Sequence, residues 1–170
     1  MRIAETKRLI LSKITTNDAA FILELMNSPG WLKYIGDRNI KTVEAATEHI
    51  ENNQLKCYET YGFGYYKIQI KAQNFKTIGT CGLLKRDELE HVDIGFSLLP
   101  NYQGKGYGFE AVTEIMNLAK SEFNMKRICA ITLPINEPSI HLLEKLGLSY
   151  QKTVKPFDNN EELLLFAKDL

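Results

Sequence analysis

The sequence predicts an α/β protein (of the α+β type) in which a mixed, mostly antiparallel central sheet is flanked by helices. Its middle part alternates apolar and polar residues between short turns, which is typical of an antiparallel meander. Segments on both sides of that region place apolar residues at helical spacing instead. The length of 170 residues corresponds to about one domain, and no repeat or linker-like stretch divides the chain. We therefore expect residues 1–170 to form a single domain.

The N-terminal part of the chain predicts one strand and two helices. The apolar run at residues 8–14 is typical of a strand. Polar residues 16–18 can cap a helix that Pro29 and Gly30 end, and Thr42 can cap a second helix. The apolar faces of these two helices are expected to consist of Phe21, Ile22, Leu25 and Met26, and of Val43, Ala46 and Ile50.

The remaining elements follow from the same two periodicities. Three strands are expected at residues 66–70, 76–85 and 92–98. A glycine-rich loop then precedes a helix whose apolar face consists of Val112, Ile115, Met116, Ala119 and Phe123. The last elements are a strand at 127–133, a helix at 138–146 that Gly147 ends, and strands at 148–154 and 163–168. The predicted order is β-α-α-β-β-β-α-β-α-β-β.

Composition and charge argue against several classes of function. Lys and Arg number 21 and Asp and Glu also number 21, so the basic excess of a general nucleic-acid binder is absent. The N-terminal residues lack the apolar stretch of a signal peptide, and the most apolar segment, 163–167, is too short to span a bilayer. The isolated cysteines favour neither a disulfide framework nor a zinc site. We expect a cytoplasmic protein with no metal and with neither membrane nor nucleic acid as partner.

The most informative segment is the glycine-rich loop at residues 103–108, which follows a predicted strand and precedes a predicted helix. Glycines let backbone amides point into one concavity, and the helix N-terminus adds partial positive charge. These features favour a phosphate site. The spacing fits neither GxxxxGK[ST], because position 99 is Leu, nor GxGxxG, because position 109 is Phe. The alternative is a tight strand-to-helix turn that binds no ligand.

The loop and the strand before it resemble motifs of a known family. Gln103-x-x-Gly106-x-Gly108 is similar to the Q/R-x-x-G-x-G/A pyrophosphate loop of the GNAT superfamily of acetyl-CoA-dependent N-acetyltransferases. The preceding residues 93–100 resemble the fourth strand of that family. The element order predicted above fits the same fold.

Two further regions extend the resemblance over nearly the whole chain. Asn136-x-x-Ser139 and residues 144–148 resemble the downstream cofactor segment of the family. Residues 8–11 and 31–38 resemble its RimJ/RimL-like branch, the ribosomal-protein N-terminal acetyltransferases. Four segments in the same order make the resemblance much more specific than the loop alone.

The resemblance implies acetyl-CoA as cosubstrate and no metal. The pantetheine arm would pair, like an added strand, with the backbone of Phe96, Ser97 and Leu98. The pyrophosphate would be held by the amides of Gln103, Gly104, Lys105, Gly106, Tyr107 and Gly108. Asn136 would contact the cofactor arm near Ser139, although an asparagine at that position is equally suited to cap a helix.

The resemblance also suggests catalytic residues. Asp93 is placed to accept the proton of the amine, directly or through a water, and its alternative is a carboxylate on a solvated strand face. Many family members carry a tyrosine as the acid for the departing thiolate, but Leu143 occupies that position here. Ser139 is the substitute that lies nearest to the expected thioester position.

The acceptor is less defined than the cofactor. Trp31 and Tyr34 are expected to line the acceptor groove, or else to belong to the core. A protein N-terminus or a small amine would fit as acceptor, and a monomer or a homodimer as oligomeric state. The alternative function is a non-catalytic CoA-binding or regulatory module on the same fold.

Overall fold

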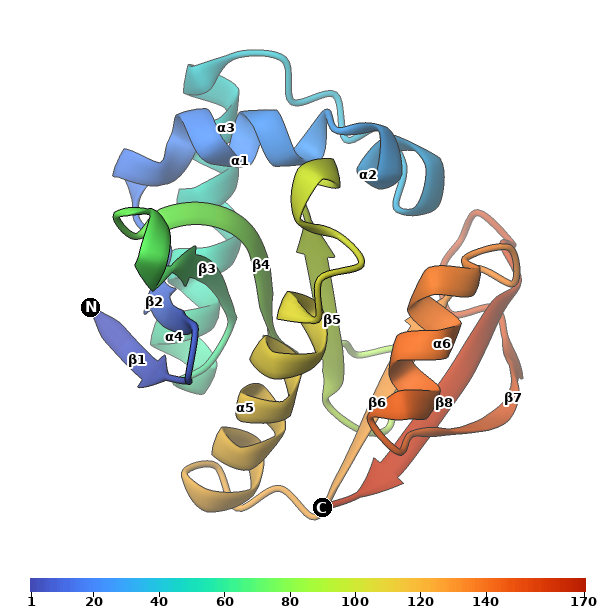
Figure 1. Ribbon diagram of the computed structural model, residues 1–170. Coiled ribbons are helices and arrows are strands. Elements are labelled where there is room, and N and C mark those ends of the chain that lie inside the picture. The colour runs from blue at the N-terminus through green and yellow to red at the C-terminus, as the bar shows by residue number, and fades with distance from the viewer.

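Eight strands form one sheet in the computed structural model, which describes residues 1–170 (Figure 1). The strand order is β1-β2-β3-β4-β5-β6-β8-β7, and all neighbours are antiparallel except β5 and β6. The strands are β1 (Arg2–Glu5), β2 (Leu9–Lys13), β3 (Tyr65–Ile70), β4 (Lys76–Leu84), β5 (Asp93–Leu98), β6 (Arg127–Thr132), β7 (Ser149–Val154) and β8 (Leu163–Asp169). The predicted mixed, mostly antiparallel sheet is confirmed.

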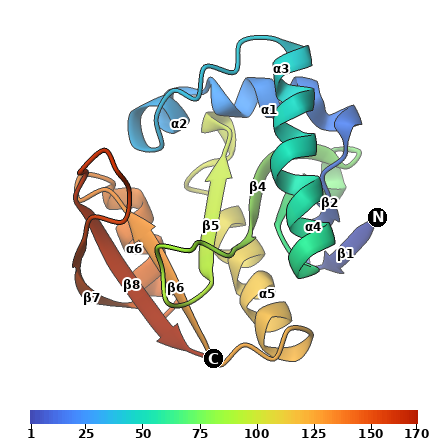
Figure 2. The same cartoon turned by 180° about the vertical axis from the view of Figure 1, so that it is seen from behind.

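Helices cover both faces of this sheet. They are α1 (Ala19–Met26), α2 (Pro29–Tyr34), α3 (Val43–His49), α4 (Lys56–Tyr61), α5 (Tyr107–Ser121) and α6 (Glu137–Lys145). A π-helical stretch, Ile50–Leu55, joins α3 to α4. Helices α5 and α6 lie on one face, and α3 and α4 lie on the other, as the view from behind shows (Figure 2).

The main core lies between α5 and the sheet. Ala111, Val112, Ile115 and Ala119 of α5 are fully buried in one cluster with apolar residues of the central strands. This confirms the apolar face predicted for the helix, although Phe123 lies just beyond its end. A second, smaller cluster packs α1 and α3 together through Ile14, Ala19, Ile22, Met26, Ala46 and Ile50.

Strands β5 and β6 pair at one position only. Asp93 lies opposite Cys129, whose N–H donates to the Val92 carbonyl over 3.0 Å, and no further residues of the two strands pair. From there the strands diverge toward the carboxyl end of β5 (Figure 1). Because backbone groups alternate between the two edges of a strand, the N–H and C=O of Phe96 face this gap without a ladder partner.

Three details of the N-terminal region differ from the predictions. Strand β1 was not predicted, because its four residues show no clear alternation of apolar and polar side chains. Pro29 does not simply end a helix but is the first residue of α2, where a proline costs no hydrogen bond. Thr42 caps α3 as predicted, since its Oγ1 accepts from the Ala45 amide over 3.1 Å. Val43, however, is 45% exposed and does not lie on the buried apolar face predicted for this helix.

The core packing gives a first prediction. Replacing Ile115, which is fully buried, by Ala should lower the free energy of unfolding by about 2–5 kcal/mol, because the cavity left in α5 cannot collapse completely. Chemical denaturation measures this change. The matched control is Ile135→Ala, because Ile135 is 63% exposed and its truncation should change stability by less than about 0.5 kcal/mol. Equal losses in the two variants would contradict the packing described here.

Candidate active site

The loop between β5 and α5 presents a row of unpaired backbone donors. Gly104 and Gly106 adopt φ values of +71° and +79°, a region that favours glycine, and Gly106 is the N-cap of α5. The amides of residues 104–109 donate to no backbone or side-chain acceptor. Residues 103–106 are exposed. These donors stand at the positive end of a 15-residue helix, which is the arrangement that binds phosphate.

Gln103 contributes to this loop mainly by shaping it. Its amide donates to the Pro100 carbonyl over 3.3 Å, and its Nε2 donates to the Leu98 carbonyl over 2.9 Å. Both donors are therefore used within the β5–α5 connection. The free amides begin at Gly104, one residue later than the sequence alone predicted.

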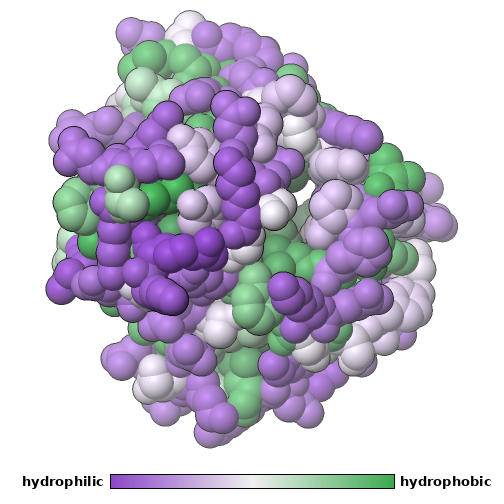
Figure 3. Space-filling view, viewed as in Figure 1, coloured by the Kyte–Doolittle hydropathy of each residue, from purple (hydrophilic) through white to green (hydrophobic).

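The gap between β5 and β6 lies beside this loop. Phe96, Ser97 and Leu98 are half-buried along its β5 edge, and α6 lies on its other side (Figure 1). In the space-filling view, apolar surface surrounded by hydrophilic residues lies in the hollow between α5 and α6 (Figure 3). An extended, partly apolar chain could therefore lie in the gap and reach the loop with one end.

Asn136 and Ser139 lie at the start of α6. The Asn136 Oδ1 accepts from the Ser139 amide over 3.3 Å, so this residue is the N-cap of the helix. The helix-cap interpretation of Asn136 is thereby confirmed. The Ser139 hydroxyl is half-buried and makes no hydrogen bond within the protein.

Asp93 lies where β5 and β6 part, and it is only 3% exposed. This burial contradicts the alternative of a carboxylate on a solvated strand face. The Asp93 Oδ2 accepts from Arg86 Nε over 2.9 Å, while Oδ1 has no side-chain partner. Burial raises the pKa of Asp93 to about 6, although Arg86 and the nearby Ile131 amide oppose this rise.

Tyr65 extends across the sheet toward the same place. It lies opposite Gly82, which in turn lies opposite Gly95, and a Cβ at Gly95 would come within 2.0 Å of the Tyr65 hydroxyl. Only glycine at position 95 therefore leaves room for the phenol ring. Burial and the charge of Asp93 raise the pKa of Tyr65 above its ordinary value, so the hydroxyl keeps its proton at neutral pH.

Arg86 is a site residue that the sequence analysis missed. It precedes β5 in a charged turn, where an arginine is unremarkable, and its role depends on packing that sequence spacing does not reveal. Its guanidinium contacts Asp93 on one side and lies 5.4 Å from the Phe157 ring, in the β7–β8 connection, on the other.

Trp31 and Tyr34, the predicted acceptor-site residues, both belong to α2. This helix lies across the open end of the gap in both views (Figures 1 and 2). Trp31 packs against the α1–α3 cluster, and its indole N–H is buried without a partner. Tyr34 is half-buried, with Lys33 Nζ 5.0 Å from its ring centre.

No three His, Cys, Asp or Glu side chains converge as a metal site would require. No helix combines the length and the apolar character needed to cross a membrane.

Comparison with known proteins identifies the family. The model of the acetyltransferase (GNAT) domain matches residues 8–149, so the chain belongs to the GNAT acetyltransferase family. A curated relative is an uncharacterized N-acetyltransferase p20 of Bacillus licheniformis. It is 29% identical over 161 residues, which cover 94% of this chain and 89% of that protein.

Solved structures share the whole fold. RimL, a ribosomal L7/L12 alpha-N-protein acetyltransferase in complex with coenzyme A, superposes with a TM-score of 0.82 over 100% of this chain and 98% of its own, at 15% identity. The microcin C7 self-immunity acetyltransferase MccE, in complex with acetyl-CoA and AMP, has a TM-score of 0.81 over 97% and 94%, at 16% identity. The predicted GNAT fold is confirmed, whereas the ribosomal-protein branch stays a prediction.

The contact between Arg86 and Asp93 gives a second prediction. Arg86→Met keeps much of the side-chain volume but removes the positive charge that lowers the pKa of Asp93, so this pKa should rise above 6. Carbon-13 NMR titration of the aspartate carboxyl groups measures the midpoint. Lys85→Met, one residue away and without a contact to Asp93, is the control. An unchanged midpoint in Arg86→Met would show that the ion pair does not govern this carboxyl group.

Proposed function

We propose that the protein transfers an acetyl group from acetyl-CoA to a primary amine in a ternary complex. The observation that carries the proposal is the set of free amides at residues 104–109, next to the unpaired edge of β5. Together they match a ligand with a pyrophosphate at one end and an amide-containing arm at the other. Coenzyme A has this shape, and relatives of the same fold are described as complexes with it.

In this proposal the chain binds the cofactor almost entirely through its backbone. The amides of residues 104–108 bind the pyrophosphate, and Lys105 adds a positive charge. The arm pairs with Phe96 and its neighbours on β5 as an added strand would. Asn136 caps α6, and through this helix it places the Ser139 hydroxyl beside the gap.

The chemistry then needs a base, an oxyanion site and an acid. The amine nitrogen attacks the thioester carbon, its C–N bond forms, and the C–S bond breaks. Asp93 accepts the proton released from the amine, directly or through a water, because a carboxyl group with a pKa of about 6 is ionised at neutral pH. A β5 amide stabilises the oxyanion, and Ser139 donates a hydrogen bond to the departing sulfur.

We propose a protein N-terminus or a small amine as acceptor, entering beside α2 near Trp31 and Tyr34. RimL and MccE illustrate that one fold serves acceptors of different kinds, since the first is described as acting on a ribosomal protein and the second as conferring immunity to a microcin. Placement in the ribosomal-protein branch rests on the N-terminal motifs alone.

The test combines cofactor binding with turnover. Acetyl-CoA or CoA should raise the melting temperature, because a ligand at 100 times its Kd adds about 2.7 kcal/mol to the free energy of unfolding. NAD and ATP should have little effect. Release of free thiol over a panel of peptides and small amines then measures transfer. Absence of stabilisation by millimolar CoA would overturn the proposal. Binding without transfer to any amine would instead indicate the non-catalytic module.

The same experiment includes a variant of the loop. Gly106→Val places a β-branched residue at a φ of +79° and should weaken CoA binding severely. Gly62→Val is a matched control, because Gly62 has a φ of +77° at the end of α4, away from the loop. Both variants should lose stability, but only Gly106→Val should lose affinity for CoA.

Asp93→Asn tests the base. Its kcat should fall by a factor on the order of 10² to 10⁴, while the Kd for acetyl-CoA changes far less. Since an ionised carboxylate is needed, the wild-type rate should rise with pH through about 6, and the variant should lack this limb. Its rate should recover partly toward about pH 9, where more of the amine is neutral. Asp87→Asn, in the exposed turn before β5, is the control. A wild-type profile in Asp93→Asn would assign the base elsewhere.

A further inference from the structure

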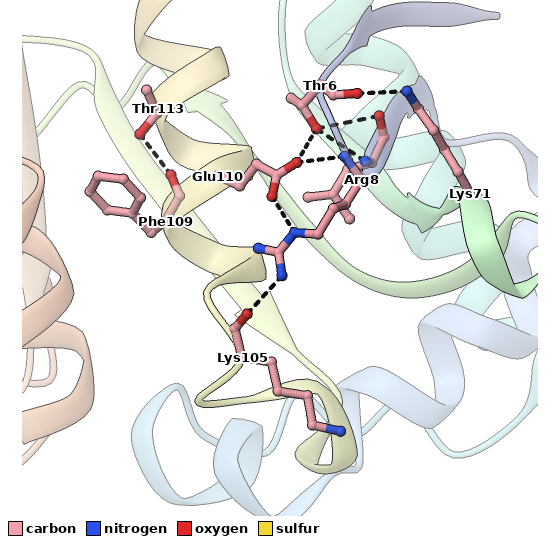
Figure 4. Close-up of polar contacts among 8 residues, drawn as sticks. Thr6, Arg8, Lys71, Lys105, Phe109, Glu110 and Thr113 are labelled. Atoms are coloured by element: carbon pink, nitrogen blue, oxygen red, sulfur yellow. Dashed lines mark hydrogen bonds and ion pairs between the residues drawn. The ribbon is translucent and has the colours of Figure 1, made fainter.

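The loop that carries the free amides is anchored from outside by an arginine that precedes β2 (Figure 4). Arg8 Nε lies 2.6 Å from Glu110 Oε2, and Arg8 Nη1 donates to the Lys105 carbonyl over 3.0 Å. The Arg8 guanidinium also lies 4.5 Å from the centre of the Tyr107 ring. One side chain thus contacts three residues of the loop and of the first turn of α5.

Glu110 is held just as firmly as Arg8. Its Oε1 accepts from the Arg8 amide over 2.8 Å and from the Thr6 hydroxyl over 2.6 Å. Burial opposes ionisation, but the Thr6 and Arg8 hydrogen bonds outweigh it and keep the pKa of Glu110 below its ordinary value. The carboxylate therefore stays charged, and it fixes the orientation of the guanidinium.

The bond to the Lys105 carbonyl has a direct geometric consequence for the loop. A trans peptide is planar, so the Lys105 C=O and the Gly106 N–H point in opposite directions. Because the Lys105 carbonyl is bonded to Arg8, the Gly106 amide points away from Arg8 and is held in that orientation. Without this anchor, a segment with two glycines at positive φ has many other conformations available.

The charge of Glu110 is a second reason why its pairing with Arg8 matters for the loop. Glu110 lies in the first turn of α5, close to where a phosphate would bind, and an unpaired carboxylate there would repel it. Pairing with Arg8 cancels this charge. Arg8 and Glu110 thus form a neutral pair beside the loop, while Lys105 keeps the free positive charge of the loop itself.

We propose that Arg8 is a positioning residue for acetyl-CoA, which holds the pyrophosphate-binding amides in place through the Lys105 carbonyl and Glu110 and does not itself contact the cofactor. The inference rests on the proposed function, because it assumes that CoA binds at this loop. It adds Arg8, which lies nearly 100 positions before the loop in the sequence, to the residues that determine cofactor affinity.

The test is a set of calorimetric titrations with CoA and with dephospho-CoA, which lacks the 3′-phosphate. Arg8→Ala should weaken both ligands equally, by a factor on the order of 10 to 100, because a charge-assisted anchor is lost. Arg8→Lys keeps the charge but cannot reach Glu110 and Lys105 together, so it should recover only part of the affinity. Glu110→Gln should also weaken CoA, and the double variant should be no weaker than Arg8→Ala.

Controls separate anchoring from a general loss of fold. Arg2→Ala removes an exposed ion pair with Glu5 on β1 and should leave the affinity unchanged. In Arg8→Ala without ligand, the NMR amide signals of Gly104 and Gly106 should shift or broaden, while those of β6 and β8 stay in place. A folded variant with disordered loop signals and weaker binding is the expected result.

Other outcomes would overturn the inference. If Arg8 bound the 3′-phosphate directly, the loss in Arg8→Ala would disappear with dephospho-CoA, and Glu110→Gln would leave CoA affinity unchanged or increase it. Wild-type affinity in a folded Arg8→Ala would show that the anchor is not needed. Failure of the wild-type protein to bind CoA would contradict the proposed function itself, which this series distinguishes from failure of the anchor.

Discussion

The rest of the structure depends on the fact that β5 and β6 pair at one position only. Six residues of β6 pair with β8, which in turn pairs with β7, so these three strands form one paired group. This group meets the remainder of the sheet through Asp93 and Cys129. A full parallel ladder would have used the backbone groups of Phe96 and closed the space beside α5. The single pairing leaves an open strand edge in the middle of a sheet, where backbone groups are otherwise paired.

The same junction explains why a carboxylate is buried there. A charged group in the interior is costly unless it has a partner, and Arg86 is that partner for Asp93. The compensation is incomplete, since the pKa of Asp93 still lies above its ordinary value. A group whose charged and neutral forms are close in free energy at moderate pH is well suited to exchange protons. Burial and the single ion pair with Arg86 together account for this raised pKa.

The sequence predicted the parts of the fold that depend on local pattern. The meander, the apolar face of α5 and the cap of α3 by Thr42 all follow from periodicity or from one side chain, and the structure confirms them. The predictions failed where tertiary context decides. Alternation along β5 placed Asp93 on one face of the strand, but it could not show that Arg86 contacts it there and that the fold buries it.

The candidate site likewise contains some features that the sequence predicts and others that only the fold reveals. Glycines at 104 and 106 are visible in the sequence, because only a few residue types tolerate their backbone angles. The contacts of Arg8 and Arg86 cannot be deduced from the sequence, since only the fold brings each residue near its partner. Arg8 stands in the 8–11 motif, but no sequence pattern links it to Glu110, and none links Arg86 to Asp93.

The contact between Arg8 and Glu110 also bears on how the protein folds. It joins residues 102 positions apart, so the loop acquires its final shape only after the N-terminal strands have docked against α5. Contacts of such high sequence separation close large loops and tend to form late. A chain can therefore have most of its helices and its meander in place while the loop between β5 and α5 is still unformed. Under the proposed function, affinity for CoA would then mark the completion of folding.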